Sequence, residues 1–145
     1  IELILIQSHD LRGRVAIAAA AAASESAAYA RRRQHLSQAE GAARRLDRVG
    51  STWAAGLAAA LRAGRLTLSG GGRRRGAGAG VLESLAVAET AFEAANMEVH
   101  AHFARRARAL VSDSSADLAA SEADLARCGV RRPDLLSRVF LPGRW

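Results

Sequence analysis

The sequence predicts an α+β fold, with a small αβ unit at each end of a helical connector. Three observations lead to this prediction. Residues 1–7 form a short apolar run rich in β-branched side chains, which is typical of a buried strand. Residues 98–103 alternate between apolar and polar side chains, as a half-buried strand does. Between them, residues 34–49 repeat apolar side chains every three or four positions, which indicates an amphipathic helix.

The first unit is expected to span residues 1–33. After the opening strand, residues 8–14 contain Asp10 and Gly13 and predict a tight turn. A weak second strand is expected at residues 15–17, and the alanine-rich stretch that follows favours a helix.

The connector is expected to span residues 34–96. Gly50 is expected to end its first helix, and a second helix should then run to about residue 63. Residues 69–80 contain six glycines and predict a flexible basic linker. Helix is expected to resume over residues 81–95.

The second αβ unit is expected to span residues 97–145. After the strand and a basic turn, Ser114 and Asp117 stand three positions apart and match a helix-capping box. Gly129 is the glycine expected after the end of that helix. The remainder, with two prolines, is predicted to be extended.

The composition indicates a basic protein with a thin core. The 145 residues carry a formal net charge of +7, all 21 basic residues are arginine, and 35 residues are alanine. A GC-rich gene explains arginine in place of lysine, but it does not explain the excess of base over acid. Because guanidinium groups bind phosphate in a bidentate way, RNA or DNA is the favoured partner over an acidic membrane.

Several function classes find little support. No nucleophile, base and acid stand together, so we expect no enzymatic activity, no small-molecule substrate and no cofactor. His100 and His102 share one face of the predicted strand, but no further ligands complete a metal site, so none is expected. Cys128 is the only cysteine and is predicted to be a small buried residue, and no apolar run is long enough for a membrane span.

Two arginine triplets, at residues 31–33 and 73–75, are candidate phosphate contacts. The second triplet lies in the glycine-rich linker and is a candidate for an arm that becomes ordered on RNA. Tyr29 precedes the first triplet and is a candidate for stacking on a base, although a lone tyrosine more often lies at the edge of a core. The alternative for both triplets is a solvated arginine surface.

Three segments resemble the ninth protein of the bacterial large ribosomal subunit. Residues 3–15 resemble that family's opening strand and its Leu-Gly-basic turn, and residues 29–32 resemble its Gly-Tyr-Ala-Arg-Asn segment. Residues 110–119, followed by Gly129-Val130 and Leu141-Pro142, resemble motifs of its C-terminal domain in the same order. The chain departs from the family at Ala28 and Arg32, and the glycine-rich linker interrupts the family's continuous helix.

The resemblance implies a structural constituent of the large subunit that contacts ribosomal RNA and neighbouring ribosomal proteins. An organellar ribosome, mitochondrial or plastid, or a bacterial one is the expected location, and the start at Ile1 without methionine is what removal of a targeting sequence leaves. The residues expected to contact RNA are Arg12, Arg14, Tyr29, Arg31, Arg32, Arg33, Arg73, Arg74 and Arg75.

Two other interpretations stay open. The first is an alanine-rich helical interaction or scaffold protein that does not bind RNA, secreted or part of a larger assembly. It is favoured by the alanine content and by Trp53 to Gly56, which resembles the Trp-x-Gly turn of small secreted helical hairpins with one residue too many. It predicts helix, and no strand, at residues 1–6. The second is a structural subunit of an organellar membrane complex, held by protein contacts.

Overall fold

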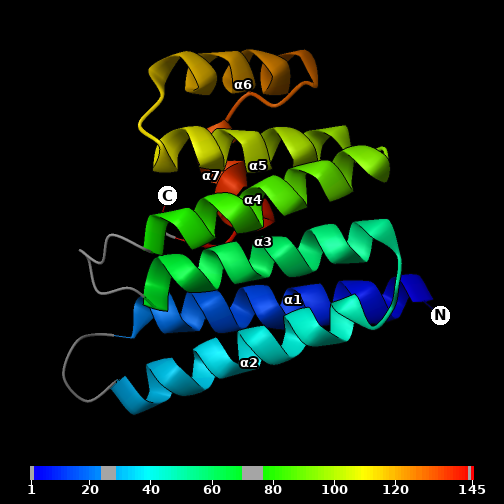
Figure 1. Ribbon diagram of the computed structural model, residues 1–145, viewed down its shortest axis with the longest axis vertical. Helices are drawn as coiled ribbons and strands as arrows, with labels where there is room; N and C mark the ends of the chain where they lie inside the picture. Colours follow the sequence, from blue (N-terminus) through cyan, green and yellow to red (C-terminus); the bar gives the residue numbers. More distant parts are fainter. Residues whose placement is uncertain (1, 24–28, 70–76, 144) are drawn as a thin grey trace.

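The computed structural model describes residues 2–23, 29–69, 77–143 and 145, and these residues form helices joined by short connections (Figure 1). No strand occurs among the described residues, so the predicted α+β fold with its two αβ units is wrong. The helices described are α1 (Glu2–Ala22), α2 (Tyr29–Asp47), α3 (Thr52–Ser69), α4 (Ala77–Ala94), α5 (Glu98–Val111), α6 (Ser115–Arg127) and α7 (Pro133–Phe140).

From α1 to α6, helices that follow one another in the chain pack side by side. From α2 to α6 they form a stack, which Figure 1 shows from bottom to top. Helix α1 packs against both α2 and α3, so the first three helices form a compact unit at one end of the stack. Helix α7 packs against α5, and the chain after it returns to α3, where Pro142 meets Gly64. The end of the chain therefore connects the two halves of the stack.

The opening strand and turn that the sequence predicted are both part of α1. The buried side of this helix carries Ile6, Gly13 and Ile17, at spacings of seven and four, which is the period of a helix and not of a strand. Gly13 does not form a turn. A side chain at this position would stand 2.4 Å from a methyl carbon of Leu61, so glycine allows α1 and α3 to approach closely.

The strand predicted at residues 98–103 is the first part of α5. Val99 and Phe103 are four positions apart, so they share a side in a helix just as they do in a strand. Phe103 is fully buried and stacks on Phe140 of α7, with ring centroids 5.2 Å apart. Helix α7 replaces the predicted extended tail because Pro133 stands in the first turn, where its missing N–H costs no hydrogen bond.

The sequence predicted the helical connector more accurately than the two units at its ends. Helices occur as predicted on both sides of Gly50, whose φ of 79° allows the chain to leave α2. The Ser114 side chain accepts a hydrogen bond from the backbone N–H of Asp117, which confirms the predicted N-cap of α6, and Gly129 with φ 83° follows its end. Cys128 is exposed, so the prediction that it is buried is wrong. Residues 70–76 of the predicted linker lie outside the described residues.

The segment from Trp53 to Gly56 serves helix packing. Gly56 lies under the ring of Phe92, and a Cβ there would stand 2.7 Å from two ring carbons. Glycine therefore allows α3 and α4 to pack at short range, and Phe92 itself is buried.

Arg105, near the middle of α5, hydrogen-bonds to side chains of both neighbouring helices, α4 and α6. The guanidinium of Arg105 donates to Glu89 at 2.8 Å and to Glu93 at 2.8 Å on α4, and to Asp124 at 3.4 Å on α6. We expect Arg105→Gln to lower the free energy of unfolding by about 1–2 kcal/mol, because the buried carboxylate of Glu89 loses a charged donor. Chemical denaturation measures this loss. Arg127→Gln, which removes an exposed partner of Asp124, should change stability by less than about 0.5 kcal/mol, and equal losses would contradict the argument.

His100 gives the fold a pH dependence. Its ring lies between Phe92 and Phe140, with centroid distances of 5.2 Å and 4.9 Å, and burial together with the charge of Arg14 lowers its pKa from the ordinary 6.5. Below about pH 6.5 the unfolded chain therefore binds more protons than the folded chain, and stability should fall as the pH falls. Asp10 acts in the opposite sense, since burial, opposed by Arg14, raises its pKa.

Thermal unfolding in two pH windows separates the two contributions. Between pH 7.5 and 5.5 we expect the loss of Tm on acidification to be smaller in His100→Gln than in the unchanged chain, because glutamine does not titrate. As the pH falls further towards 3.8, Asp10→Asn should make the loss of Tm larger, because it removes a carboxyl group whose raised pKa opposes that loss. An unchanged pH dependence in His100→Gln would show that other groups control it.

Candidate nucleic-acid interface

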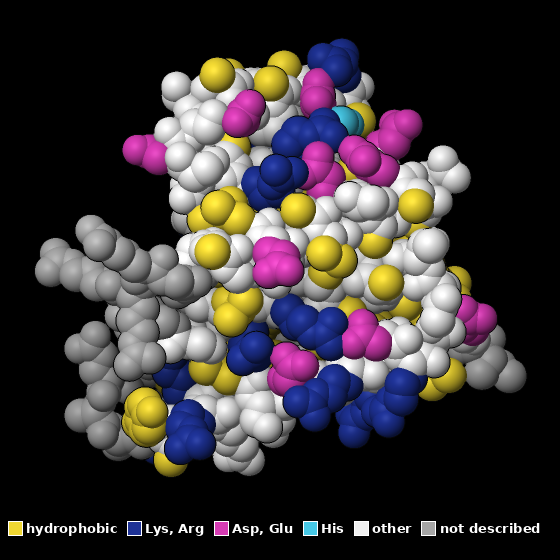
Figure 2. Space-filling model, viewed as in Figure 1, with side chains coloured by type: hydrophobic (Ala, Val, Ile, Leu, Met, Phe, Trp, Pro, Cys, Tyr) yellow, Lys and Arg dark blue, Asp and Glu magenta, His cyan; other side chains and the backbone are white. Residues whose placement is uncertain are grey.

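Positive charge is concentrated at the α2 end of the molecule. Residues 29–48 contain six arginines and two carboxylates, a formal net charge of +4. Residues 98–127 contain four arginines and five carboxylates, a formal net charge of −1. In Figure 2 arginines gather over α2 and α3 in the lower part, whereas those in the upper part lie among acidic side chains.

The two ends also differ in how their arginines are paired. On α5 and α6, Arg105, Arg106, Arg108 and Arg127 each form an ion pair with a carboxylate. On α2 and just after it, Arg44 forms one with Glu40 at 3.4 Å. Among the described residues, no ion pair with a carboxylate is formed by Arg31, Arg32, Arg33, Arg45 or Arg48. The α2 end therefore presents cations that no carboxylate of the described residues neutralises.

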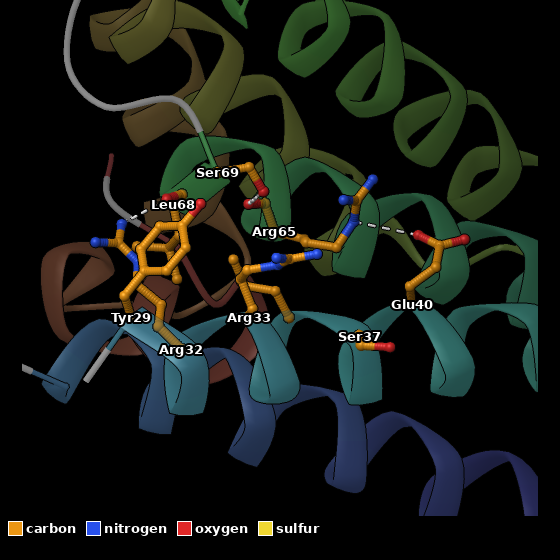
Figure 3. Close-up of a pocket in the computed structure, with 9 residues that line it drawn as sticks. Tyr29, Arg32, Arg33, Ser37, Glu40, Arg65, Leu68 and Ser69 are labelled. Carbon is orange, nitrogen blue, oxygen red and sulfur yellow. Dashed lines mark hydrogen bonds and ion pairs between the residues drawn. The ribbon is translucent and has the colours of Figure 1, made fainter. Parts of the chain in front are cut away.

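A groove between α2 and α3 gathers part of these cations (Figure 3). It encloses about 480 Å³, and α2 contributes most of its lining. The residues that line it are Tyr29, Arg32, Arg33, Leu36, Ser37, Glu40, Arg65, Leu68 and Ser69. Three of the residues that the sequence singled out for RNA contact are thus brought together in one groove.

The three predicted residues play different parts in the groove. Arg32 donates to the backbone carbonyl of Leu68 near the end of α3, and no carboxylate of the described residues forms an ion pair with it. Arg33 is exposed and extends into the space between the helices, as Figure 3 shows. The Tyr29 side chain is 71% exposed at the mouth of the groove, which corrects the view of it as a core-edge residue.

The opposite wall of the groove carries an arginine that sequence reasoning missed. Arg65 of α3 lies 3.2 Å from Glu40, which also lies 3.5 Å from Arg62. Glu40 partly neutralises this wall and holds Arg65 in place beside the free charge of Arg33. A hairpin of α2 and α3 about Gly50 places residue 33 opposite the last turns of α3, so a longer predicted α3 would have revealed Arg65.

The start of α2 has an electrostatic arrangement that favours an anion. Arg31, Arg32 and Arg33 lie in or next to the first turn of α2, where the helix dipole is positive. Cations at this end of a helix repel the dipole and each other. A phosphate bound there would be attracted to the arginines and to the helix end alike.

The other predicted RNA contacts do not join this groove. Arg12 is exposed on α1 and lines a separate groove. Arg14 is used within the fold, because it pairs with Asp10 at 2.7 Å and donates to the carbonyl of Val139 at 2.8 Å. Arg31 is exposed beside the groove, and Arg73, Arg74 and Arg75 lie outside the described residues.

Other site types find no support in the part of the chain that the structure describes. His100 and His102 point in different directions from α5, since His102 lies 3.6 Å from Asp124 whereas His100 lies between two phenylalanines. No group of three or more metal-ligating side chains occurs among the described residues. Within the same residues, none of the helices has the length and apolar character that crossing a bilayer requires.

The chain was compared with models of protein families, with curated proteins and with solved structures, and none of the three comparisons gives a match.

Proposed function

We propose that this protein binds single-stranded RNA through the groove between α2 and α3. The observation that carries the proposal is the convergence of Tyr29, Arg32 and Arg33 on one groove, where neither of these two arginines forms an ion pair with a carboxylate of the described residues. A positively charged groove beside an exposed aromatic ring is the arrangement that binds unpaired nucleic-acid strands.

The groove assigns separate roles to its residues. Arg33 and Arg32 neutralise backbone phosphates at the start of α2, and the N–H groups of the helix end add to that attraction. The exposed ring of Tyr29 stacks on a base that follows the bound phosphates. Glu40 keeps Arg65 extended along the far wall and prevents it from folding over the groove.

The proposal is narrower than the resemblance to the ninth large-subunit protein. That resemblance implies αβ units at both ends, and the described residues form helices there instead. Binding to ribosomal RNA and location in an organellar or bacterial ribosome therefore rest on the sequence matches alone. The helical fold is compatible with RNA binding and with a protein-interaction role, and it does not decide between them.

Fluorescence anisotropy with a labelled twelve-nucleotide uridine RNA tests the proposal. We expect binding at 50 mM salt that weakens steeply as salt rises, with log K falling by about 0.7 per log unit of salt for each phosphate neutralised. A duplex RNA of the same length should bind less well, because its bases cannot stack on Tyr29. Absence of binding at 50 mM salt, or an affinity that does not change with salt concentration, would refute the proposal.

The ribosomal part is tested separately by co-sedimentation of the tagged protein with ribosomal particles from its own cells at rising salt. Retention with the large subunit at low salt and release at high salt would support that assignment. Binding to the uridine RNA without retention on ribosomes would leave the RNA-binding proposal intact and end the ribosomal one.

A further inference from the structure

Helix α1 is apolar on two opposite sides, although only one of them is buried in the core. The outward side presents apolar residues at positions 4, 11, 15, 18 and 22, and spacings of three, four and seven place residues on one side of a helix. Its exposed members are Ile4 at 69%, Leu11 at 56% and Val15 at 59%, followed by exposed Ala18 and Ala22. A row of exposed aliphatic side chains marks an interaction surface more often than it occurs by chance, so the outward side of α1 has the character of an interface.

The exposed stripe borders a groove between α1 and α2. The groove encloses about 610 Å³, and its apolar part is formed by Leu11 and Val15 of α1 and by Gly41 and Ala42 of α2. A Cβ at Gly41 would meet no atom within 4 Å, so an open notch lies beside the stripe. A ridge of aliphatic side chains next to such a notch is the surface on which a second helix packs.

The rim of the groove is positively charged. Arg12 and Arg45 line it together with His35, and no acidic residue contributes to its lining. The pKa of His9, one turn before Arg12, is lowered by burial and by the positive charges of Arg45, Arg12 and Arg48. A partner that covers the aliphatic stripe must therefore bring negative charge to its edges.

We propose that the groove between α1 and α2 docks an amphipathic helix of another protein, with aliphatic side chains on its contact face and acidic residues flanking them. The stripe from Ile4 to Ala22 is about 27 Å long, which corresponds to a partner helix of about five turns. This role goes beyond RNA binding, because it uses the α1 side of α2 and not the side that faces α3.

Two other occupants fit the surface less well. The first is a second copy of this chain, related by a two-fold axis. Because Leu11 lies near the middle of the stripe, Arg12 of one copy would lie close to Arg12 of the other. The two positive charges would repel each other, since the groove contributes no carboxylate between them. RNA would place its charged backbone against the aliphatic side chains of Leu11 and Val15, which offer its bases neither an aromatic ring nor a hydrogen-bond donor. The charge pattern thus favours an acidic helix.

The test uses two synthetic 21-residue peptides built from seven-residue repeats with leucine at the first and fourth positions. The first peptide carries glutamate at the positions that flank the leucines and lysine on its outer face. The second carries lysine at the flanking positions and glutamate on its outer face, so both peptides have the same composition. We expect the peptide with flanking glutamate to bind the full chain at least about tenfold more tightly, as measured by fluorescence anisotropy. Leu11→Gln/Val15→Gln should weaken its binding at least about tenfold, whereas Val87→Gln, at an exposed valine of α4, should not.

The outcomes separate this proposal from the RNA-binding one. The Leu11→Gln/Val15→Gln variant should keep its helical circular dichroism and its affinity for the uridine RNA, since both residues are exposed on α1. Equal binding of the two peptides would refute the charge argument, and no binding of either would refute the docking surface. Sedimentation as a dimer that this variant abolishes would identify a second copy as the occupant and overturn the proposal.

Discussion

Replacing Arg32 and Arg33 together with glutamine is expected to weaken binding of the uridine RNA about 25-fold at 0.1 M salt. Both line the groove and neither has a carboxylate partner among the described residues, so each can neutralise one phosphate. For single strands each such contact contributes about 0.7 to the salt slope, which corresponds to about fivefold per contact at 0.1 M salt. Two independent signals are therefore expected, a lower affinity and a salt slope that is smaller by about 1.4.

The matched control removes the same amount of charge from the other end of the molecule. Arg127→Gln/Arg132→Gln also lowers the net charge by two, but both arginines are exposed and already paired with carboxylates, Asp124 and Asp134. It should leave affinity within about twofold, because a paired cation releases few counter-ions from RNA. A similar loss in the two double variants would show that net charge, and not the groove, controls binding. Glutamine at position 32 retains an amide donor for the Leu68 carbonyl, so the fold should persist.

The sequence located part of this groove because its residues are neighbours in the chain. Tyr29, Arg32 and Arg33 fall within two turns of one helix, so a local reading groups them correctly even though it assigned the surrounding fold wrongly. Arg65 was missed because its proximity to Arg33 depends on how α2 and α3 fold back on each other. The pairing of Glu40 with Arg44 could be predicted from their spacing of four in α2, whereas its pairing with Arg62 and Arg65 depends on the fold.

The fold prediction failed at residues 1–7, where the apolar run is too short to distinguish the two-residue period of a strand from the 3.6-residue period of a helix. Residues 1–7 contain five apolar side chains, a pattern typical of a strand buried on both sides. In α1 the same run provides one buried residue, Ile6, while Leu3, Ile4 and Leu5 are exposed. The misreading therefore came from assuming that every apolar side chain is buried in this chain. The same assumption hid the outward stripe of α1, on which the proposed helix docking depends.

Glycines were the second source of error, because their role depends on contacts between distant segments. Gly13 was interpreted as a turn residue, yet it lies inside α1 and faces Leu61. Gly50 was interpreted correctly, because a positive φ at the end of a helix is a local requirement. With so many alanines in the chain, helices can pack closely, and glycine is needed wherever even a methyl group does not fit.

Gly64→Ala is the change expected to destabilise the fold most among those considered, by about 2–3 kcal/mol. A Cβ at this position would stand 1.8 Å from the backbone oxygen of Pro142 and 3.3 Å from a methyl carbon of Ile17. Because the first obstacle is backbone, a rotamer change cannot relieve it, and the segment around Pro142 must move. That segment includes Leu141, which is 1% exposed, so its displacement exposes part of the core.

The displacement has its own spectroscopic signal. The indole N–H of Trp145 donates to the carbonyl of Leu141 at 2.9 Å, so Trp145 should move with the displaced segment. In a Trp53→Phe background Trp145 is the remaining tryptophan, and Gly64→Ala should shift its emission to longer wavelength while most helical circular dichroism persists.

Gly41→Ala is the control that separates a steric clash from helix propensity. Nothing lies within 4 Å of a Cβ at Gly41, which stands inside α2, so alanine there should raise stability by about 0.5–1 kcal/mol. The same substitution inside two helices is therefore expected to have opposite signs, and chemical denaturation measures both. If Gly64→Ala were as favourable as Gly41→Ala, the close approach of Pro142 to α3 would not exist in solution, and the link that the end of the chain makes between the two halves of the stack would be lost with it.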